Sequence, residues 1–129
     1  MRVVLDASAA IEIALEREHS KIFLEKVKNS SVVLAPDTFV SEVTNVFWKY
    51  KKFQQFTDDV CIAGIEFCIN LVDIFVDSKE LWREAYLEGI KNNSSPYDMF
   101  YLVVARRNVA KILSCDKKLF EIAQAEKLT

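Results

Sequence analysis

Four carboxylates in this sequence have neighbours that could make them chemically active. Asp6 and Asp116 each follow a short apolar run. Asp98 lies near the start of a long apolar segment, and Glu42 borders an apolar stripe. If these four side chains converge, their mutual repulsion requires a cation. Mg²⁺ and Mn²⁺ take oxygen ligands, and one or two such ions beside a phosphate are the usual means of phosphodiester hydrolysis.

Each of these acids could instead have an ordinary structural role. Asp6 could cap a helix, although Ser8 is an equally good cap, so both roles stay open for Asp6. Asp98 stands where the acid of a capping box would stand, and here too both roles stay open. The cap is favoured for Asp116, and a solvated surface position is favoured for Glu42. The prediction of a site therefore rests on the four residues together.

The elements that must position these acids alternate along the chain. Short apolar runs predict strands at residues 2–6, 31–35, 72–76 and 111–115. Helical periodicity predicts helices at residues 8–18, 20–29, 37–51, about 57–71, about 79–92, 94–108 and from about 117. No hairpin signal separates the strands, so the pattern predicts an α/β fold with three α/β/α layers and a central parallel sheet of four strands.

Such a sheet places Asp6 and Asp116 at the same edge, because ligand sites form outside the carboxyl ends of parallel strands. The 129 residues suit a single domain spanning 1–129. No apolar run approaches the ~20 residues of a membrane span, and no signal peptide is evident, which predicts a cytoplasmic protein. The three cysteines are expected to be buried free thiols.

The net charge and the small number of glycines exclude some classes of function. A net charge of −2 argues against nucleic-acid binding over the whole surface, but not against a nuclease that brings cations to an acidic pocket. With two glycines in the chain, a phosphate-cradling nucleotide site is disfavoured. A phosphatase with a D-x-D motif is also disfavoured, because "DAS" has no second aspartate.

Together these motifs resemble the PIN domain, specifically the single-domain VapC-type toxins of toxin–antitoxin pairs. "VVLDAS" is similar to the first motif of that family, "APDTFVSEVTNVFWK" to the second, "SPYDMFYLVVARR" to the third and "ILSCDKKL" to the fourth. The resemblance covers essentially the whole chain. Many members carry a short fifth strand after the last helix, so the sheet has five strands here if the residues after that helix form one.

The resemblance implies a Mg²⁺- or Mn²⁺-dependent endoribonuclease that cuts RNA, with transfer and ribosomal RNA as candidate substrates. Asp6, Asp98 and Asp116 would be metal ligands, and Glu42 a ligand or an orienter of the attacking water. Ser8 and Ser114 would support the metal or the phosphate indirectly, as neighbours of these ligands. The family also implies a homodimer and a cognate antitoxin protein as partners.

Several weaker signals complete the prediction. Asn45 lies one turn after Glu42 on the same flank of the predicted helix, and we expect it beside the site. The basic residues Lys49, Lys51 and Lys52 alternate with aromatics and could contact RNA, but a solvated helix end explains them equally well.

Two other functions remain open. A catalytically inactive PIN fold could bind RNA or protein, although all four acids are present. A receiver-like, phosphoryl-accepting domain would also place carboxylates at strand ends, but it needs paired acids after the first strand.

Overall fold

The computed structural model describes residues 1–129, and a parallel sheet of four strands lies at its centre. The strands are β1 (Arg2–Leu5), β2 (Val32–Pro36), β3 (Ile74–Val76) and β4 (Lys111–Leu113). Their order across the sheet is β3-β2-β1-β4. Val4 of β1 pairs with Leu34 on one side and with Ile112 on the other. The predicted parallel sheet is therefore confirmed, with β1 inside it.

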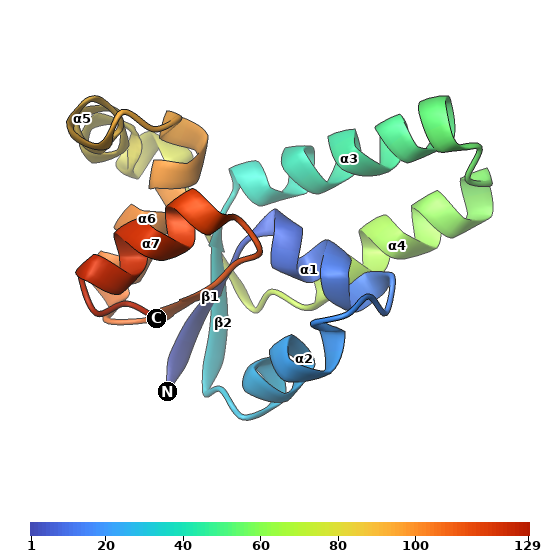
Figure 1. The fold of residues 1–129 in the computed structure, drawn as a ribbon, viewed down its shortest axis with the longest axis horizontal. Helices are drawn as coiled ribbons and strands as arrows, with labels where there is room; N and C mark the ends of the chain where they lie inside the picture. Colours follow the sequence, from blue (N-terminus) through green and yellow to red (C-terminus); the bar gives the residue numbers. More distant parts are fainter.

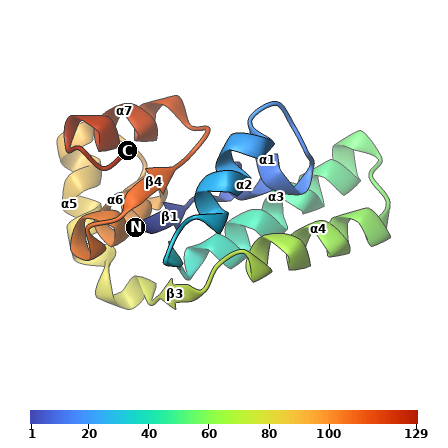
Figure 2. The ribbon, with the colours of Figure 1, turned by 90° about the horizontal axis from the view of Figure 1, so that it is seen from below.

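Seven α-helices cover the two faces of this sheet, which makes the predicted three layers (Figures 1 and 2). They are α1 (Ala7–Ala14), α2 (Ser20–Lys28), α3 (Thr38–Gln54), α4 (Asp58–Asn70), α5 (Trp82–Asn92), α6 (Pro96–Asn108) and α7 (Lys117–Ala125). Figure 2 shows α5, α6 and α7 on one side of the sheet and α1 to α4 on the other. The antiparallel pair α3 and α4 extends away from the sheet in Figure 1. None of these helices combines the length and apolar character needed to cross a bilayer.

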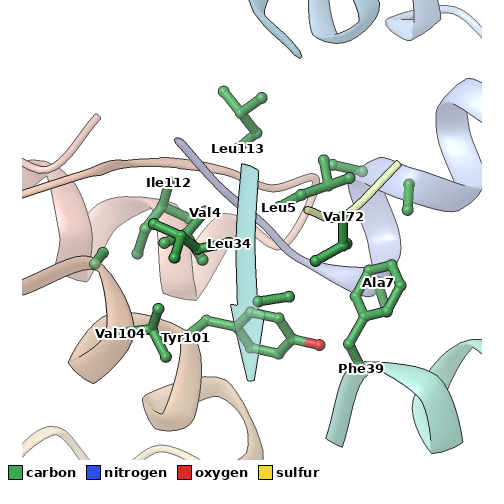
Figure 3. Close-up of a cluster of buried hydrophobic side chains, with 14 of the residues drawn as sticks. Val4, Leu5, Ala7, Leu34, Phe39, Val72, Tyr101, Val104, Ile112 and Leu113 are labelled. Carbon is green, nitrogen blue, oxygen red and sulfur yellow. The ribbon is translucent and has the colours of Figure 1, made fainter. Parts of the chain in front are cut away.

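The core forms where α6 packs on the sheet. Val4 and Ile112 from the strands are almost fully buried, as are Tyr101 and Val104 from α6. In Figure 3 these side chains meet in one cluster, and the Tyr101 ring directs its hydroxyl toward the end of the sheet where Ala7 lies. α6 is apolar on nearly every side because most of its middle is enclosed by the sheet and by α5. A polar side chain on this helix must therefore find a partner.

All four strands differ from the prediction at one end or both: β1 ends one residue earlier, β2 begins one residue later, and β4 ends two residues earlier. β2 continues through Pro36. β3 begins two residues later than predicted, because Asp73 and Val33 bond each other: the Asp73 carboxylate accepts from the Val33 N–H at 2.8 Å, and the Asp73 N–H donates to the Val33 carbonyl at 2.9 Å. The possible fifth strand is reduced to one backbone contact, in which Ile112 N–H donates to the Leu128 carbonyl at 2.7 Å.

Candidate active site

All four predicted acids line one cleft at the carboxyl ends of the strands. Asp6 follows β1, Asp116 precedes α7 beyond the end of β4, Glu42 comes from α3 and Asp98 from α6. The cleft has a volume of about 430 Å³. Four segments that are far apart in the sequence therefore bring their carboxylates to a single cleft.

Asp6 is the most enclosed of these acids, with 5 % of its surface exposed. One carboxylate oxygen, Oδ1, accepts from the Ser8 hydroxyl at 2.7 Å and from the Ala9 N–H at 2.9 Å, so Asp6, and not Ser8, caps α1. The other, Oδ2, accepts from the Ser114 hydroxyl. Burial raises the pKa of Asp6 to about 6, although these hydrogen bonds lower it.

The two serines fasten the loop after β4 to the end of β1. Ser8 Oγ accepts from the Cys115 N–H at 2.9 Å, and Ser114 Oγ accepts from the Asp116 N–H at 2.9 Å. Each hydroxyl thus donates to Asp6 and accepts from the neighbouring backbone. Asp116 in turn caps α7 by accepting from the Leu119 N–H at 2.8 Å. Asp6 and Asp116 are therefore helix caps that also face the cleft.

Glu42 has one paired and one unpaired carboxylate oxygen. The Tyr101 hydroxyl donates to Oε2 at 2.9 Å, whereas Oε1 is buried and accepts no hydrogen bond of standard geometry. The Thr38 hydroxyl, one turn earlier on α3, is also buried and unpaired, and its proximity lowers the pKa of Glu42. The pKa of Glu42 is raised to about 7. Burial is the largest cause, and the charges of Asp6 and Asp98 also contribute. An unpaired buried carboxylate oxygen is costly unless a donor or a cation reaches it. Glu42 is therefore not the solvated surface residue that was favoured for it alone.

Replacing Tyr101 with phenylalanine tests this pairing. Above pH 7 Glu42 is ionised and loses the hydrogen bond from Tyr101, so we expect the variant to be less stable than wild type by about 1.5–3 kcal/mol. Near pH 5 Glu42 is protonated, and the difference should shrink. Urea denaturation at both pH values measures the effect. An equal loss at the two pH values would show that Tyr101 acts through packing alone.

Asp98 is half-buried and does not form the capping box. Ser95 caps α6 by accepting from the Tyr97 N–H at 3.2 Å, but the Asp98 carboxylate makes no hydrogen bond. Burial and the charge of Asp116 raise the pKa of Asp98, and Lys118 offsets part of this. The carboxylate is thus free of the local role that the sequence left open.

The weaker predictions divide between the cleft and the outer surface. Asn45 is exposed and lines the rim of the cleft. Lys49, Lys51 and Lys52 are exposed on α3 outside the cleft, and Lys51 pairs with Asp58 at 3.4 Å. These three lysines are not among the residues that surround the four acids.

The structure adds cleft residues that the sequence did not indicate. They are Ala7, Ile11, Glu12, Arg17, Val46, Tyr50, Tyr101 and Cys115. Tyr101 is the informative omission, since it lies within the third motif, in a segment that the sequence marks only as apolar. The available signal was its hydroxyl, because a polar atom on a fully enclosed helix needs a partner.

The donors around the cleft suit a hard divalent cation. They are carboxylate oxygens, one of them lacks any partner, and three of the acids have pKa values raised by burial and by one another. No three acidic, histidine or cysteine side chains lie close enough together here to surround an ion.

Comparison with known proteins identifies the class of this fold and site. The profile of the PIN domain matches residues 3–125, and the chain belongs to that family. It is 25 % identical over 126 residues to Ribonuclease VapC3 of Pyrobaculum aerophilum, covering 94 % of both chains. The crystal structure of PAE2754 from Pyrobaculum aerophilum has a similar fold, with a TM-score of 0.69, 18 % identity, and coverage of 94 % of this chain and 86 % of that one.

Proposed function

We propose that this protein is a Mg²⁺- or Mn²⁺-dependent endoribonuclease, the toxin of a VapC-type toxin–antitoxin pair, acting in the cytoplasm. The observation that carries the proposal is the convergence of four carboxylates on one cleft with a buried, unpaired oxygen on Glu42. The similarity to Ribonuclease VapC3 supports RNA as the substrate class. Transfer and ribosomal RNA remain the candidate substrates.

Each acid has a role in this proposal. Asp6, Asp98 and Asp116 would hold the ion, and Glu42 would hold it or orient the attacking water. When bound, the ion would lower the pKa of a water molecule and offset the charge of the scissile phosphate. Ser8 and Ser114 keep Asp6 in a fixed orientation by donating to its two oxygens. Tyr101 holds Glu42 by donating to its Oε2.

The test is cleavage of purified transfer and ribosomal RNA with Mn²⁺, Mg²⁺ or EDTA. Asp98→Asn should abolish the metal-dependent products. The Asp98 carboxylate makes no hydrogen bond in the protein, so the substitution removes only the negative charge that would attract the metal ion. Asp59→Asn, an exposed aspartate on α4, is the matched control and should cut like wild type. Identical products from wild type and Asp98→Asn would point to a contaminating nuclease. No products from wild type with any RNA would favour an inactive binding module.

An apolar stripe on α5 offers a surface for the second copy of a homodimer. Trp82, Tyr86, Leu87 and Ile90 are all more than half exposed on this helix. They offer roughly 500 Å² of apolar surface, taking ~150–250 Å² for a whole aromatic side chain, against about 800 Å² buried per partner in a standard interface. We propose that two copies pack through this stripe. An antitoxin would then bind elsewhere and is expected to block the acidic cleft.

Ile90→Asp should convert the dimer to a monomer, because a charge buried in an apolar contact loses its hydration there. Light scattering after size-exclusion chromatography measures the mass. Ile62→Asp, at an isoleucine on α4 that is also more than half exposed, is the control and should leave the dimer intact. A monomeric wild type, or a dimer that survives Ile90→Asp, would contradict the assignment of this interface.

A further inference from the structure

Arg17 is the one basic residue that lines the acidic cleft. Five acidic residues line the same cleft, the four predicted acids and Glu12. Even so, the Arg17 guanidinium has no carboxylate within salt-bridge distance and donates no hydrogen bond within the protein. Arg106 provides a contrast, since Glu84, Glu88 and Glu126 all bind it. The donors of Arg17 are therefore free to meet something that enters the cleft.

The position of Arg17 is set by Tyr50 of α3. The Arg17 guanidinium carbon lies 5.4 Å from the centre of the Tyr50 ring, within the range of a cation–π contact. Tyr50 is itself held by two aromatic neighbours, with ring centres 5.6 Å from Phe47 and 5.0 Å from Phe56. A guanidinium beside an aromatic ring keeps its N–H groups available, and these match the geometry of phosphate oxygens.

The negative charge of the cleft would hinder RNA binding unless a positively charged side chain offsets it. An RNA strand brings phosphates on both sides of the bond that is cut, and a bound cation would serve the scissile one. The neighbouring phosphates would meet the remaining negative charge of the cleft, which repels them. A fixed positive charge at the wall of the cleft offsets that repulsion and sets the register of the strand.

We propose that Arg17, supported by the Tyr50 ring, is the substrate-binding residue that grips a phosphate of single-stranded RNA next to the scissile one. This inference rests on the proposed ribonuclease function. It adds that the cleft binds a second phosphate of the substrate, through Arg17 and not through the carboxylates. Arg17 contributes binding, and the hydrolysis itself depends on the acids.

The experiment measures cleavage of a short fluorophore–quencher RNA of mixed sequence with Mn²⁺ over a range of salt concentrations. Arg17→Ala should raise KM about tenfold with kcat little changed, the scale of one charge-assisted hydrogen bond. The slope of log(kcat/KM) against log[salt] should become shallower by about 0.7, as expected when one phosphate contact to a single strand is lost. Tyr50→Leu should raise KM by a smaller factor, whereas Tyr50→Phe keeps the ring and should behave as wild type.

Arg83→Ala is the matched control, because Arg83 is an exposed arginine on α5 that lies outside the cleft and makes no ion pair. Thermal melting of each variant verifies folding. If wild type cuts the RNA and Arg17→Ala matches Arg83→Ala in KM and in salt slope, the role of Arg17 is overturned and the ribonuclease stands. If wild type cuts no RNA at all, the proposed function fails, and the role of Arg17 fails with it.

Discussion

Asp6→Asn should abolish RNA cleavage and at the same time make the metal-free protein more stable at neutral pH. Asp6 is buried, and its pKa of about 6 against an ordinary 3.8 means that the folded state resists its ionisation. At 1.36 kcal/mol per pKa unit, ionising Asp6 above pH 7 lowers the free energy of unfolding by on the order of 2 to 3 kcal/mol. Asparagine has a similar shape, carries no charge, and can still accept from the Ala9 N–H.

The activity should fall by roughly a thousandfold, the scale of losing one electrostatic stabiliser of a transition state. Urea denaturation in EDTA measures the stability, and RNA cleavage with Mn²⁺ measures the activity. Glu66→Gln, an exposed acid on α4, controls for the loss of one negative charge from the surface. A variant that cuts RNA at the wild-type rate would remove Asp6 from the site. A variant less stable than wild type would mean that the carboxylate stabilises the fold.

The metal-free protein should lose stability as the pH rises from about 4 to about 7. In the folded state the pKa of Asp6 is raised to about 6 and that of Glu42 to about 7, from ordinary values of 3.8 and 4.5. Between these values the folded state binds more protons than the unfolded state, so stability falls with rising pH. Below about pH 4 both states are protonated at these sites, and their full contribution is present.

Divalent cations should reverse this loss, because an ion binds the deprotonated carboxylates. The rise in melting temperature on adding millimolar MnCl₂ should therefore be small near pH 5 and large near pH 8. Melting curves across this range in EDTA and in MnCl₂ provide both measurements. The double variant Asp6→Asn, Glu42→Gln should flatten the dependence on pH and on Mn²⁺ alike. A wild-type stability that rises from pH 5 to pH 7.5 in EDTA would contradict the assigned pKa values.

The sequence by itself determined the sheet and the edge at which the acids lie. Alternating apolar runs and amphipathic segments without hairpin turns allow a parallel sheet, and parallel strands end at a common edge. Asp6 and Asp116 were therefore placed on that edge from the positions of the runs that precede them. Strand lengths were less predictable, since the bonds between Asp73 and Val33 delay β3 through a contact across 40 residues.

Tertiary structure alone decided what surrounds each carboxylate. The sequence favoured a surface position for Glu42, because helical periodicity shows which face of a helix a residue lies on but not which other helix packs against that face. In the structure Tyr101 of α6 packs against Glu42 and donates to one of its carboxylate oxygens. Asp98 could equally have closed a capping box, and only its side-chain position excludes that role. Arg17 carries no sequence signal at all, because its contact with Tyr50 joins a loop and a helix that are far apart in the sequence. Local pattern specifies elements and their order, whereas partners across the cleft depend on how those elements pack.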